Sequence, residues 1–439
     1  MKIKNLFKVF LLVAVTAIFS CSSSDDSSDG NGNGNGNGSG ATSITITPNV
    51  LFADFNTAFS FTVKTNDGTD VTSESTILVG GSEITGSTFT PATTGEHLVN
   101  ATYDGLTSSN VTITVLPVLV SIDIAPNESQ VAIGETIEYT VMGTDNDGNT
   151  NNVTSAATIM IDDAAAAFGN KHIANAVGTV QAYATLSDMT SSTVDVEVVS
   201  NSTLGLGSYG QKALIEDYTG TWCGWCPRVS YGIELVEEAT DDAVVVAVHN
   251  DNEMGNNFVN QLSGTFNPGG SYPTAIVNRT TEWTYPEPNN VNQITNLASG
   301  TSDVGLSVNS LVNGSHISVS VSAGFAQSTP GAKLVVFVLE SGLVYSQENY
   351  TEYYGGEDVI SDFVHNHVLR YSLTDVIGDA IPAGDTAANS VYNASFDMTL
   401  PNGTVTIPSN LEIVAMVVGS NNQLINAQAA HIGEHVAFE

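Results

Sequence analysis

The segment "IEDYTGTWCGWCP", residues 215–227, contains two of the three cysteines of this 439-residue chain. A mostly apolar run ends in polar residues just before the pair, and "CPRVSYGIELVEEA" (226–239) has the apolar spacing of a helix. Pro227 is tolerated in the first turn of a helix. Cys223 and Cys226 are therefore predicted to lie on a turn that joins a strand to a helix.

Three further segments complete a pattern around this turn. "AVVVAVHN" (243–250) is a continuous apolar run, as in a central strand covered on both faces. "NNFVNQLSGTF" (256–266) predicts a helix, and "YPTAIVN" (272–278) predicts a further strand. This alternation of strands and helices around a C-x-x-C motif resembles the thioredoxin fold, and it predicts an α/β thioredoxin-like domain over residues 205–300.

The resemblance to thioredoxins implies roles for individual residues. Asp217, six residues before Cys223, matches their buried carboxylate, and Pro273 matches the cis-proline beside their disulfide. Trp222 matches the aromatic residue before the first cysteine. The resemblance implies that Cys223 is the nucleophile, that Cys226 resolves the mixed disulfide, and that Asp217 accepts a proton from Cys226.

The position of the cysteines also has a physical consequence. Unpaired N–H groups and partial positive charge at a helix N-terminus stabilise a thiolate and lower its pKa. Cys223 is thus expected to be exposed and reactive, and Arg228 in the first turn would favour its thiolate further. Trp222 and Trp225 are expected to contact the substrate. This chemistry requires a protein thiol or disulfide as substrate, and no cofactor or metal is expected.

Other interpretations of the cysteine pair stay open. In an exported protein the pair could form a permanent disulfide, and the chain could then serve binding or adhesion without catalysis. A zinc site needs about four ligands, and only two thiolates are present, with His249 the nearest histidine in sequence. Asp217 could equally be a polar residue at a strand end. An accessible Cys223 would indicate catalysis, whereas a buried disulfide would indicate a structural role.

The N-terminal residues have the features of an export signal. Lysines accompany an apolar run over residues 6–19, which has the length of a signal peptide and is too short for a stable transmembrane anchor. Cys21 resembles the lipidated cysteine of bacterial lipoproteins, and the following "SSSDD" resembles a signal for the outer face of the outer membrane. We predict a signal peptide at 1–20, a lipid on Cys21 as the outer-membrane attachment, and a flexible Gly/Asn/Ser tether at 21–42. A plain secretory signal is the alternative.

The chain is strongly acidic. It has 10 Lys and Arg residues against 46 Asp and Glu residues, a formal net charge of −36. A chain of this charge is repelled by phosphate backbones, so nucleic acid is not expected as a partner. Acidity of this kind is typical of a soluble exported surface.

An internal repeat follows the tether. "SITITPN" (43–49) is echoed by "SIDIAPN" (121–127), and each copy contains short alternating strands with Asp-Gly turns. The copies resemble bacterial immunoglobulin-like domains, which implies β-sandwiches over 43–117 and 118–200 that act as spacers. The loop at 144–152 has carboxylates that suit calcium, but a hairpin turn is the favoured interpretation.

The C-terminal residues return to strand patterns. We predict a β-sandwich domain over 301–439. Within it, His365 and His367 of "HNHVLR" alternate, so both are expected to point the same way from one strand. That spacing could hold a metal, but a structural or interface role is favoured because no third ligand is evident.

The cysteine motif and "HNHVLR" together resemble the 28-kDa outer membrane protein family of Bacteroidetes-type bacteria. The resemblance covers roughly 205–437 and implies a thioredoxin-like domain joined to a β-sandwich, lipid-anchored in the outer membrane. The expected fold class is therefore multidomain and mainly β, with two immunoglobulin-like sandwiches, one α/β thioredoxin-like domain and one C-terminal sandwich. The expected function is thiol–disulfide exchange with protein substrates; the alternative is a non-catalytic surface-binding lipoprotein with a structural disulfide.

Overall fold

The computed structural model describes residues 40–201, 207–284 and 290–439. The predicted signal peptide, the predicted lipid attachment site Cys21 and most of the predicted tether lie outside these residues. Strands predominate in the described part, so the predicted mainly β architecture with several sheets is confirmed. None of the helices in this part is long and apolar enough to cross a bilayer.

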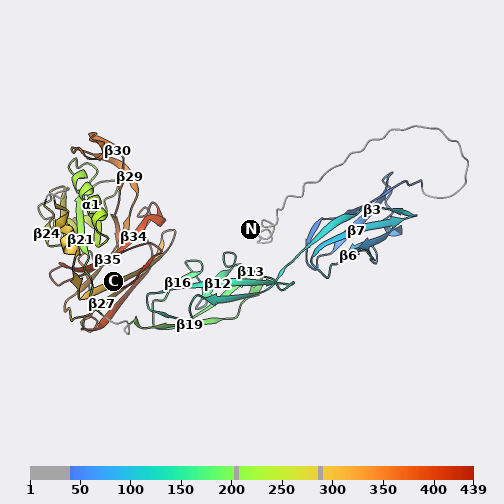
Figure 1. Cartoon of the computed structure of the whole chain (residues 1–439), viewed down its shortest axis with the longest axis horizontal. Coiled ribbons are helices and arrows are strands. Elements are labelled where there is room, and N and C mark those ends of the chain that lie inside the picture. Colours follow the sequence, from blue (N-terminus) through green and yellow to red (C-terminus); the bar gives the residue numbers. More distant parts are fainter. Residues whose placement is uncertain (1–39, 202–206, 285–289) are drawn as a thin grey trace, which may run out of the picture. The chain divides into compact units, whose positions relative to one another are not determined.

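The chain forms two compact units, whose elements are labelled in Figure 1. Of the described residues, unit 1 contains those up to Asp123 together with Met142–Val153 and Thr185–Ser191, and unit 2 contains the others. This division passes through the segment 118–200. The boundaries expected from the sequence stay a prediction.

The first repeat forms two sheets around one apolar core. In β3 (Phe59–Thr65) every second residue is buried, because alternate side chains of a strand point to opposite faces. The core takes side chains from both sheets, for example Phe59 and Ile113. The sheets have the orders β1-β3-β6 and β2-β9-β7-β4-β5, with β8 beside β7. The remaining strands are β1 (Ile44–Pro48), β2 (Phe52–Asp54), β4 (Thr76–Val79), β5 (Ser82–Glu83), β6 (Thr88–Phe89), β7 (Gly95–Tyr103), β8 (Leu106–Thr107) and β9 (Val111–Leu116).

The second repeat has a matching set of strands. A short strand pairs in parallel with the last strand in both copies, β2 with β9 and β11 with β19. The Asp145 carboxylate accepts the N–H groups of Asp147 and Asn149, so it closes the turn after β12 as the hairpin interpretation expects. The strands are β10 (Leu119–Pro126), β11 (Gln130–Ala132), β12 (Thr136–Asp145), β13 (Thr150–Asn152), β14 (Thr158–Ile161), β15 (Ala164–Ala165), β16 (Lys171–Ile173), β17 (Gly178–Leu186), β18 (Met189–Thr190) and β19 (Val194–Val199).

A nine-stranded sheet organises the C-terminal part of unit 2. The strands β21 and β22 pair in parallel, and β31 pairs in parallel with the other edge of β22. At that edge the Ala247 N–H donates to the His367 carbonyl at 2.8 Å. The sheet therefore crosses the boundary expected at residue 300. In spatial order the strands are β24 (Thr281–Glu282), β23 (Thr274–Val277), β21 (Ala213–Thr219), β22 (Ala243–His249), β31 (Val368–Ser372), β28 (Lys333–Glu340), β34 (Leu411–Val418) and β35 (Leu424–His431), with β32 (Asp379–Ala380) beside β28.

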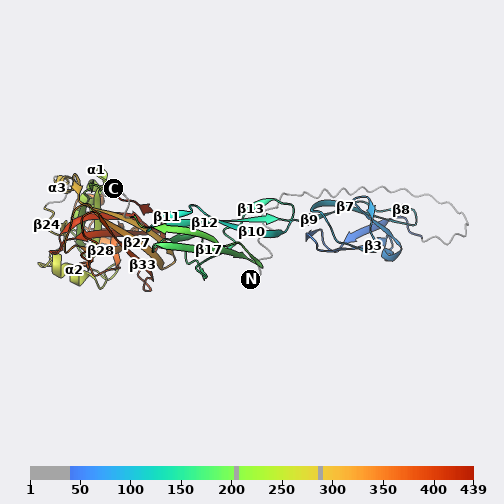
Figure 2. The same cartoon turned by 90° about the horizontal axis from the view of Figure 1, so that it is seen from below.

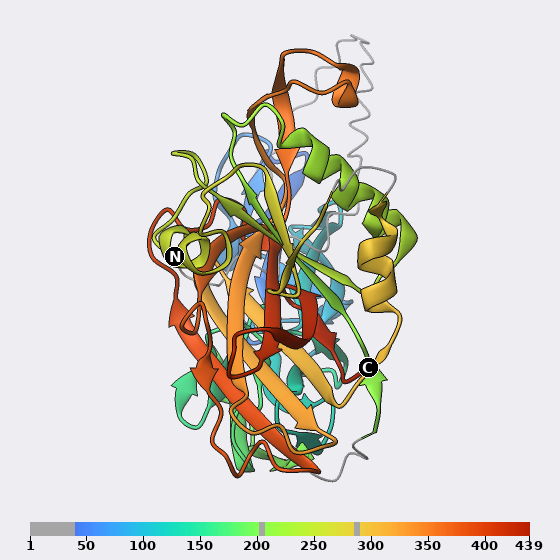
Figure 3. The same ribbon diagram turned by 90° about the vertical axis from the view of Figure 1, so that its left-hand side faces the viewer.

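Helices cover both faces of this sheet at its β21–β22 end. The helices α1 (Pro227–Ala239) and α3 (Asn292–Ala298) pack on one face, where Val236 and Ile294 share a core with Ile215. The helix α2 (Val259–Phe266) packs on the other face. Figures 2 and 3 show α1 and α3 together on one side and α2 on the opposite side. The strand β21 is buried along its whole length because it is covered on both faces.

A second sheet packs against β28 and β34 and forms a sandwich. Val336 in β28 points into the sandwich core, whereas its neighbour Phe337 points into the core beneath α2. Burial on both faces explains the continuous apolar run of β28. The second sheet has the order β33 (Ser390–Thr399), β27 (His316–Phe325), β26 (Val304–Asn313) and β36 (His435–Val436), and a further two-stranded sheet consists of β20 (Tyr209–Gly210) and β25 (Thr301–Ser302).

A hairpin, which we name the strap (residues 343–365), leaves this body near the cysteines. Its strands β29 (Leu343–Glu348) and β30 (Val359–His365) pair with each other and form a separate two-stranded sheet. His365 ends β30, and His367 follows with a φ of 54°. The expectation that His365 and His367 point the same way from one strand is wrong, because the left-handed backbone at His367 interrupts the alternation.

Candidate functional site

Cys223 and Cys226 form a disulfide between the end of β21 and the first residue of α1. Their Cα atoms are 5.4 Å apart. The Cys226 N–H donates to the Cys223 carbonyl at 3.0 Å, which closes the turn. The predicted strand–turn–helix placement of the pair is thus what the structure shows, and the disulfide is confirmed.

The disulfide is buried. Cys223 is 4% exposed and Cys226 is 1% exposed. The expectation of an exposed Cys223 is therefore wrong for this structure. The reason lies in a segment that follows Cys223 by more than 120 residues in the chain, the strap.

The strap hydrogen-bonds along the cysteine turn. The Glu348 N–H donates to the Thr221 carbonyl at 2.9 Å, and the Tyr350 N–H donates to the Gly224 carbonyl at 2.7 Å. Between them, the Gln347 side-chain amide donates to the Cys223 carbonyl at 2.9 Å. The strap therefore covers the outer side of the turn through its backbone as well as its side chains.

The tip of the strap also contacts α1. The Tyr353 ring stacks on the Tyr231 ring, with centroids 4.1 Å apart. The Tyr354 hydroxyl donates to the Glu234 carboxylate at 2.8 Å. Burial is the main cause that raises the pKa of Tyr354, and the bond to Glu234 adds to it.

The base of the strap rests on a buried histidine pair. The His365 ring lies edge-to-face with the His249 ring at 5.1 Å, and His249 Nδ1 is 2.7 Å from an Asp251 carboxylate oxygen. Burial, assisted by the neighbouring His249, lowers the pKa of His365 to about 4. Asp251 also accepts the Thr221 N–H at 3.2 Å, so this cluster supports the cysteine turn from below. Asp251 was not predicted as a site residue, because nothing in the sequence spacing connects it with residue 365.

Asp217 lies in β21, directly before the cysteine turn. Alternation places its side chain on the same face as Ile215, which is the face covered by α1. Burial raises the pKa of Asp217 to about 8, and its Oδ1 has no hydrogen-bond partner within the described part of the chain. Asp217 is therefore protonated at neutral pH, which suits a group that exchanges a proton with a neighbour.

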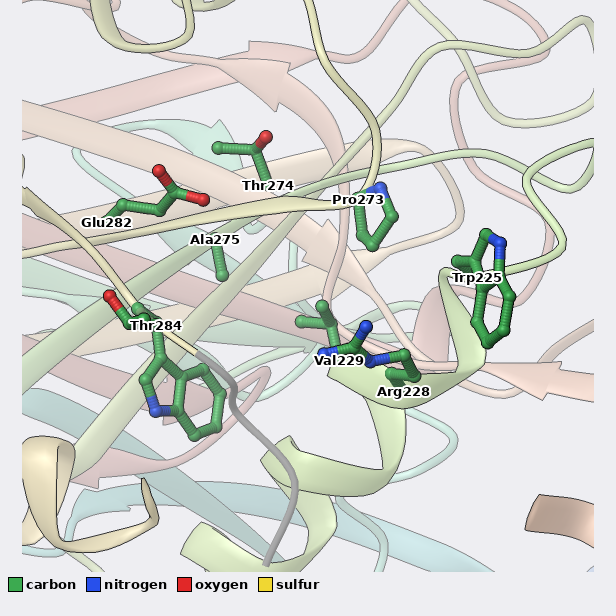
Figure 4. A pocket seen from close by; sticks show the side chains of 9 residues that line it. Trp225, Arg228, Val229, Pro273, Thr274, Ala275, Glu282 and Thr284 are labelled. Carbon is green, nitrogen blue, oxygen red and sulfur yellow. The ribbon is translucent and has the colours of Figure 1, made fainter. Parts of the chain in front are cut away.

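A cavity of about 470 Å³ opens beside the turn (Figure 4). The peptide bond between Tyr272 and Pro273 is cis, and the side chain of Pro273 lines the cavity together with that of Trp225. Trp222 lies outside this cavity: its indole N–H donates to the Asn250 carbonyl at 2.7 Å, and its ring packs against Tyr272. The other lining residues are Arg228, Val229, Thr274, Ala275, Glu282, Trp283 and Thr284.

His367 links α1 and β34 through two carboxylates. Its Nε2 lies 2.9 Å from Glu237 of α1, and its Nδ1 lies 3.0 Å from Glu412 of β34. Burial lowers the pKa of His367, but the hydrogen bonds to Glu237 and Glu412 outweigh this effect and raise it to about 9. The motif histidines thus have different environments and different charges.

The pKa of His367 predicts a pH dependence of stability. The charged form stabilises the folded state fully below the ordinary pKa of 6.5, and this contribution is lost as the pH rises through about 9. We expect His367→Gln to remove about 1–3 kcal/mol at pH 6 and much less at pH 10. Urea unfolding across this range checks the prediction. His316→Gln, which removes a more exposed pair with Asp397, is the control, and an equal pH profile for both variants would contradict it.

Comparison with known proteins identifies part of the chain. Residues 259–436 match the family "Outer membrane protein Omp28", so the resemblance deduced from the sequence is confirmed there and an outer-membrane location is supported. The match begins after both cysteines. No curated protein matches the chain in sequence.

Solved structures are similar to parts of the chain. HBP35 of Porphyromonas gingivalis is 19% identical over 52% of this chain and 76% of its own, with a TM-score of 0.42. Domains 5–6 of the S-layer protein SbsC are 18% identical over 36% of this chain and 97% of their own length, with a TM-score of 0.16. Fibronectin(III)-like modules of CbhA from Clostridium thermocellum are 16% identical over 36% of this chain and 94% of their own length, with a TM-score of 0.19.

Proposed function

Starting from the match of residues 259–436 to the outer membrane protein Omp28 family, we propose that this chain is an outer-membrane lipoprotein that exchanges disulfides with protein substrates. Lipidation of Cys21 anchors it, and the immunoglobulin-like repeats hold the cysteine-bearing part away from the membrane, on the cell surface. Its partners are a protein thiol or disulfide and the membrane, and no cofactor takes part.

One observation carries the exchange function: the disulfide stands at the start of a helix, after a strand that carries a buried protonated carboxyl and beside a cavity lined by a cis-proline. The order β21, α1, β22, α2, β23 supports a thioredoxin-like domain. The helix N-terminus stabilises a thiolate at the cysteines once the bond is open. The cavity lined by Trp225 and Pro273 would accept a substrate side chain beside the cysteine turn.

The reaction transfers two electrons from a substrate dithiol. A substrate thiolate attacks Cys223 Sγ, a mixed disulfide forms, and Cys226 leaves as a thiolate. Asp217 gives its proton to the Cys226 thiolate. The second substrate thiol, as a thiolate, then attacks the substrate sulfur of the mixed disulfide, which releases Cys223 and leaves the substrate oxidised. The same steps run backwards when the reduced pair meets a substrate disulfide.

The reduction potential of the pair tests this function. The full chain is equilibrated in thiol/disulfide buffers and its free thiols are trapped by alkylation. We expect a potential between about −120 and −270 mV, the range of exchange enzymes. We also expect Cys226→Ser to accumulate a mixed disulfide with a model protein that contains a disulfide, because Cys223 attacks that bond and no resolving thiol follows. Cys223→Ser should accumulate none. A potential below about −300 mV would identify a structural disulfide instead.

The burial of Cys223 favours a second candidate function. A disulfide between two buried cysteines can serve as a clip that fixes the turn, while another surface binds a partner. Under this proposal the chain is a surface-binding lipoprotein without catalysis. The two proposals differ in the measured potential, because a structural clip resists reduction by cellular thiols.

A further inference from the structure

The covered disulfide raises the question of how a thiol reaches it. Thiol–disulfide exchange requires direct attack on a sulfur, and access limits its rate. Cys223, the sulfur nearer the end of β21, is nearly inaccessible because the strap lies over the turn. We propose that the strap is a gate, which must leave the cysteine turn before any thiol can attack Cys223. This inference rests on the proposed exchange function for its purpose, but the gate itself can be tested separately.

The strap closes the cysteine turn through hydrogen bonds to its carbonyl oxygens. Three strap donors, the Glu348 N–H, the Tyr350 N–H and the Gln347 amide, bond to carbonyl oxygens of residues 220–224. Gln347 is itself buried, although it is a polar residue on a hairpin. These bonds can be exchanged for bonds to water when the strap lifts, so opening has a modest cost.

The strap is attached to the rest of unit 2 mainly at its base. Its strands bond to each other, and neither is a member of the nine-stranded sheet. Its base is held by Leu343, which packs with Met254 and Val368, and by His365. Its outer face is bare, with Val344 57% exposed. Beyond its base, the strap is held by the hydrogen bonds to the turn and by the contacts of its tip with α1, so it can open locally while the large sheet stays folded.

Gly224, the first of the two residues between the cysteines, lies against the strap. A Cβ atom added to Gly224 would lie 2.5 Å from the Tyr350 ring, which is too close. Gly224 is not among the glycines with a positive φ, so the turn itself tolerates a larger residue. Glycine is therefore required at this position of the C-x-x-C motif because the strap lies too close for a side chain, and the backbone angle at Gly224 does not require glycine.

The rate of reduction by dithiothreitol, measured on the full chain by alkylation of the released thiols, tests the gate. We expect Gly224→Ala to be reduced about ten-fold faster than the wild type, because the rate follows the open fraction. Gln347→Ala should act in the same direction by removing bonds to the turn. Val344→Ala, on the exposed face of the strap, is the matched control and should keep the wild-type rate.

A double variant distinguishes a steric gate from a general loosening. In Gly224→Ala/Tyr350→Ala the ring that collides with the new methyl group is gone, so the rate should return toward that of Tyr350→Ala alone. Equal rates in the wild type, Gly224→Ala and Gln347→Ala would overturn the gate. Faster reduction of these variants together with a potential below about −300 mV would uphold the gate and reject the exchange function. If the reduction potential lies in the range of exchange enzymes but the variants are reduced by dithiothreitol at the wild-type rate, the gate is rejected and the exchange function is not.

Discussion

Replacing Arg279 with methionine is expected to lower the free energy of unfolding by about 3–5 kcal/mol, because it leaves a buried carboxylate without its counter-charge. The Glu216 and Arg279 side chains are fully buried, and the Arg279 Nε and Nη2 donate to one Glu216 oxygen at 3.0 and 2.7 Å. The guanidinium also lies 4.6 Å from the centre of the Phe266 ring. Methionine keeps much of this apolar contact and removes the charge together with the two hydrogen bonds to Glu216.

Tryptophan fluorescence during urea unfolding measures this effect. The three tryptophans are Trp222, Trp225 and Trp283, so the signal reports the region around the disulfide. His316→Gln is the control: its pair with Asp397 is partly exposed, and its removal should change stability by less than about 1 kcal/mol. The double variant Arg279→Met/Glu216→Met should recover most of the loss. Equal stability of Arg279→Met and the wild type would contradict the buried pair.

Replacing Asp217 with asparagine is expected to raise the free energy of unfolding, the opposite of the effect of Arg279→Met. Burial raises the pKa of Asp217 to about 8 from an ordinary value of 3.8. Between these values the folded state binds the proton and the unfolded state does not, so stability falls as the pH rises through this window. Asparagine cannot ionise. We expect Asp217→Asn to raise the free energy of unfolding by about 2–4 kcal/mol at pH 8, with little change at pH 4.

The same variant separates a structural from a catalytic role of Asp217. If Asp217 donates a proton to Cys226, the asparagine variant should be more stable at pH 8 and yet slower in single-turnover oxidation of a substrate dithiol. Unfolding curves and quenched-flow alkylation measure the two quantities. Glu238→Gln, an exposed change on α1, is the control for both. A variant that is less stable at pH 8 would contradict the buried, protonated carboxyl.

The elements next to the cysteines follow from local sequence. The helix expected over 226–239 is α1, Pro227–Ala239, and the strand expected over 243–250 is β22, Ala243–His249. Apolar spacing and Pro227 are local signals that a neighbouring chain segment does not need to supply. The short helix α3 was not predicted, because its seven residues hold too few periodic apolar positions.

The internal repeat was predictable for a similar reason. Two copies of one pattern of alternating residues specify two sets of strands that bury one face each. The parallel pairs β2–β9 and β11–β19 show that the copies share their topology. Sequence alone thus determined the mainly β character of the chain, the repeat, and the placement of Cys223 and Cys226 before a helix.

Tertiary structure decided whether the site is open. The strap that hides Cys223, the partner that holds Glu216, and the separation of His365 from His367 all depend on contacts between residues distant in the chain or on one left-handed backbone angle. Periodicity reports which face of an element is buried, but it does not say which distant segment buries it. A C-x-x-C motif can therefore be located from its own neighbourhood, whereas its exposure is set by a hairpin more than 120 residues away.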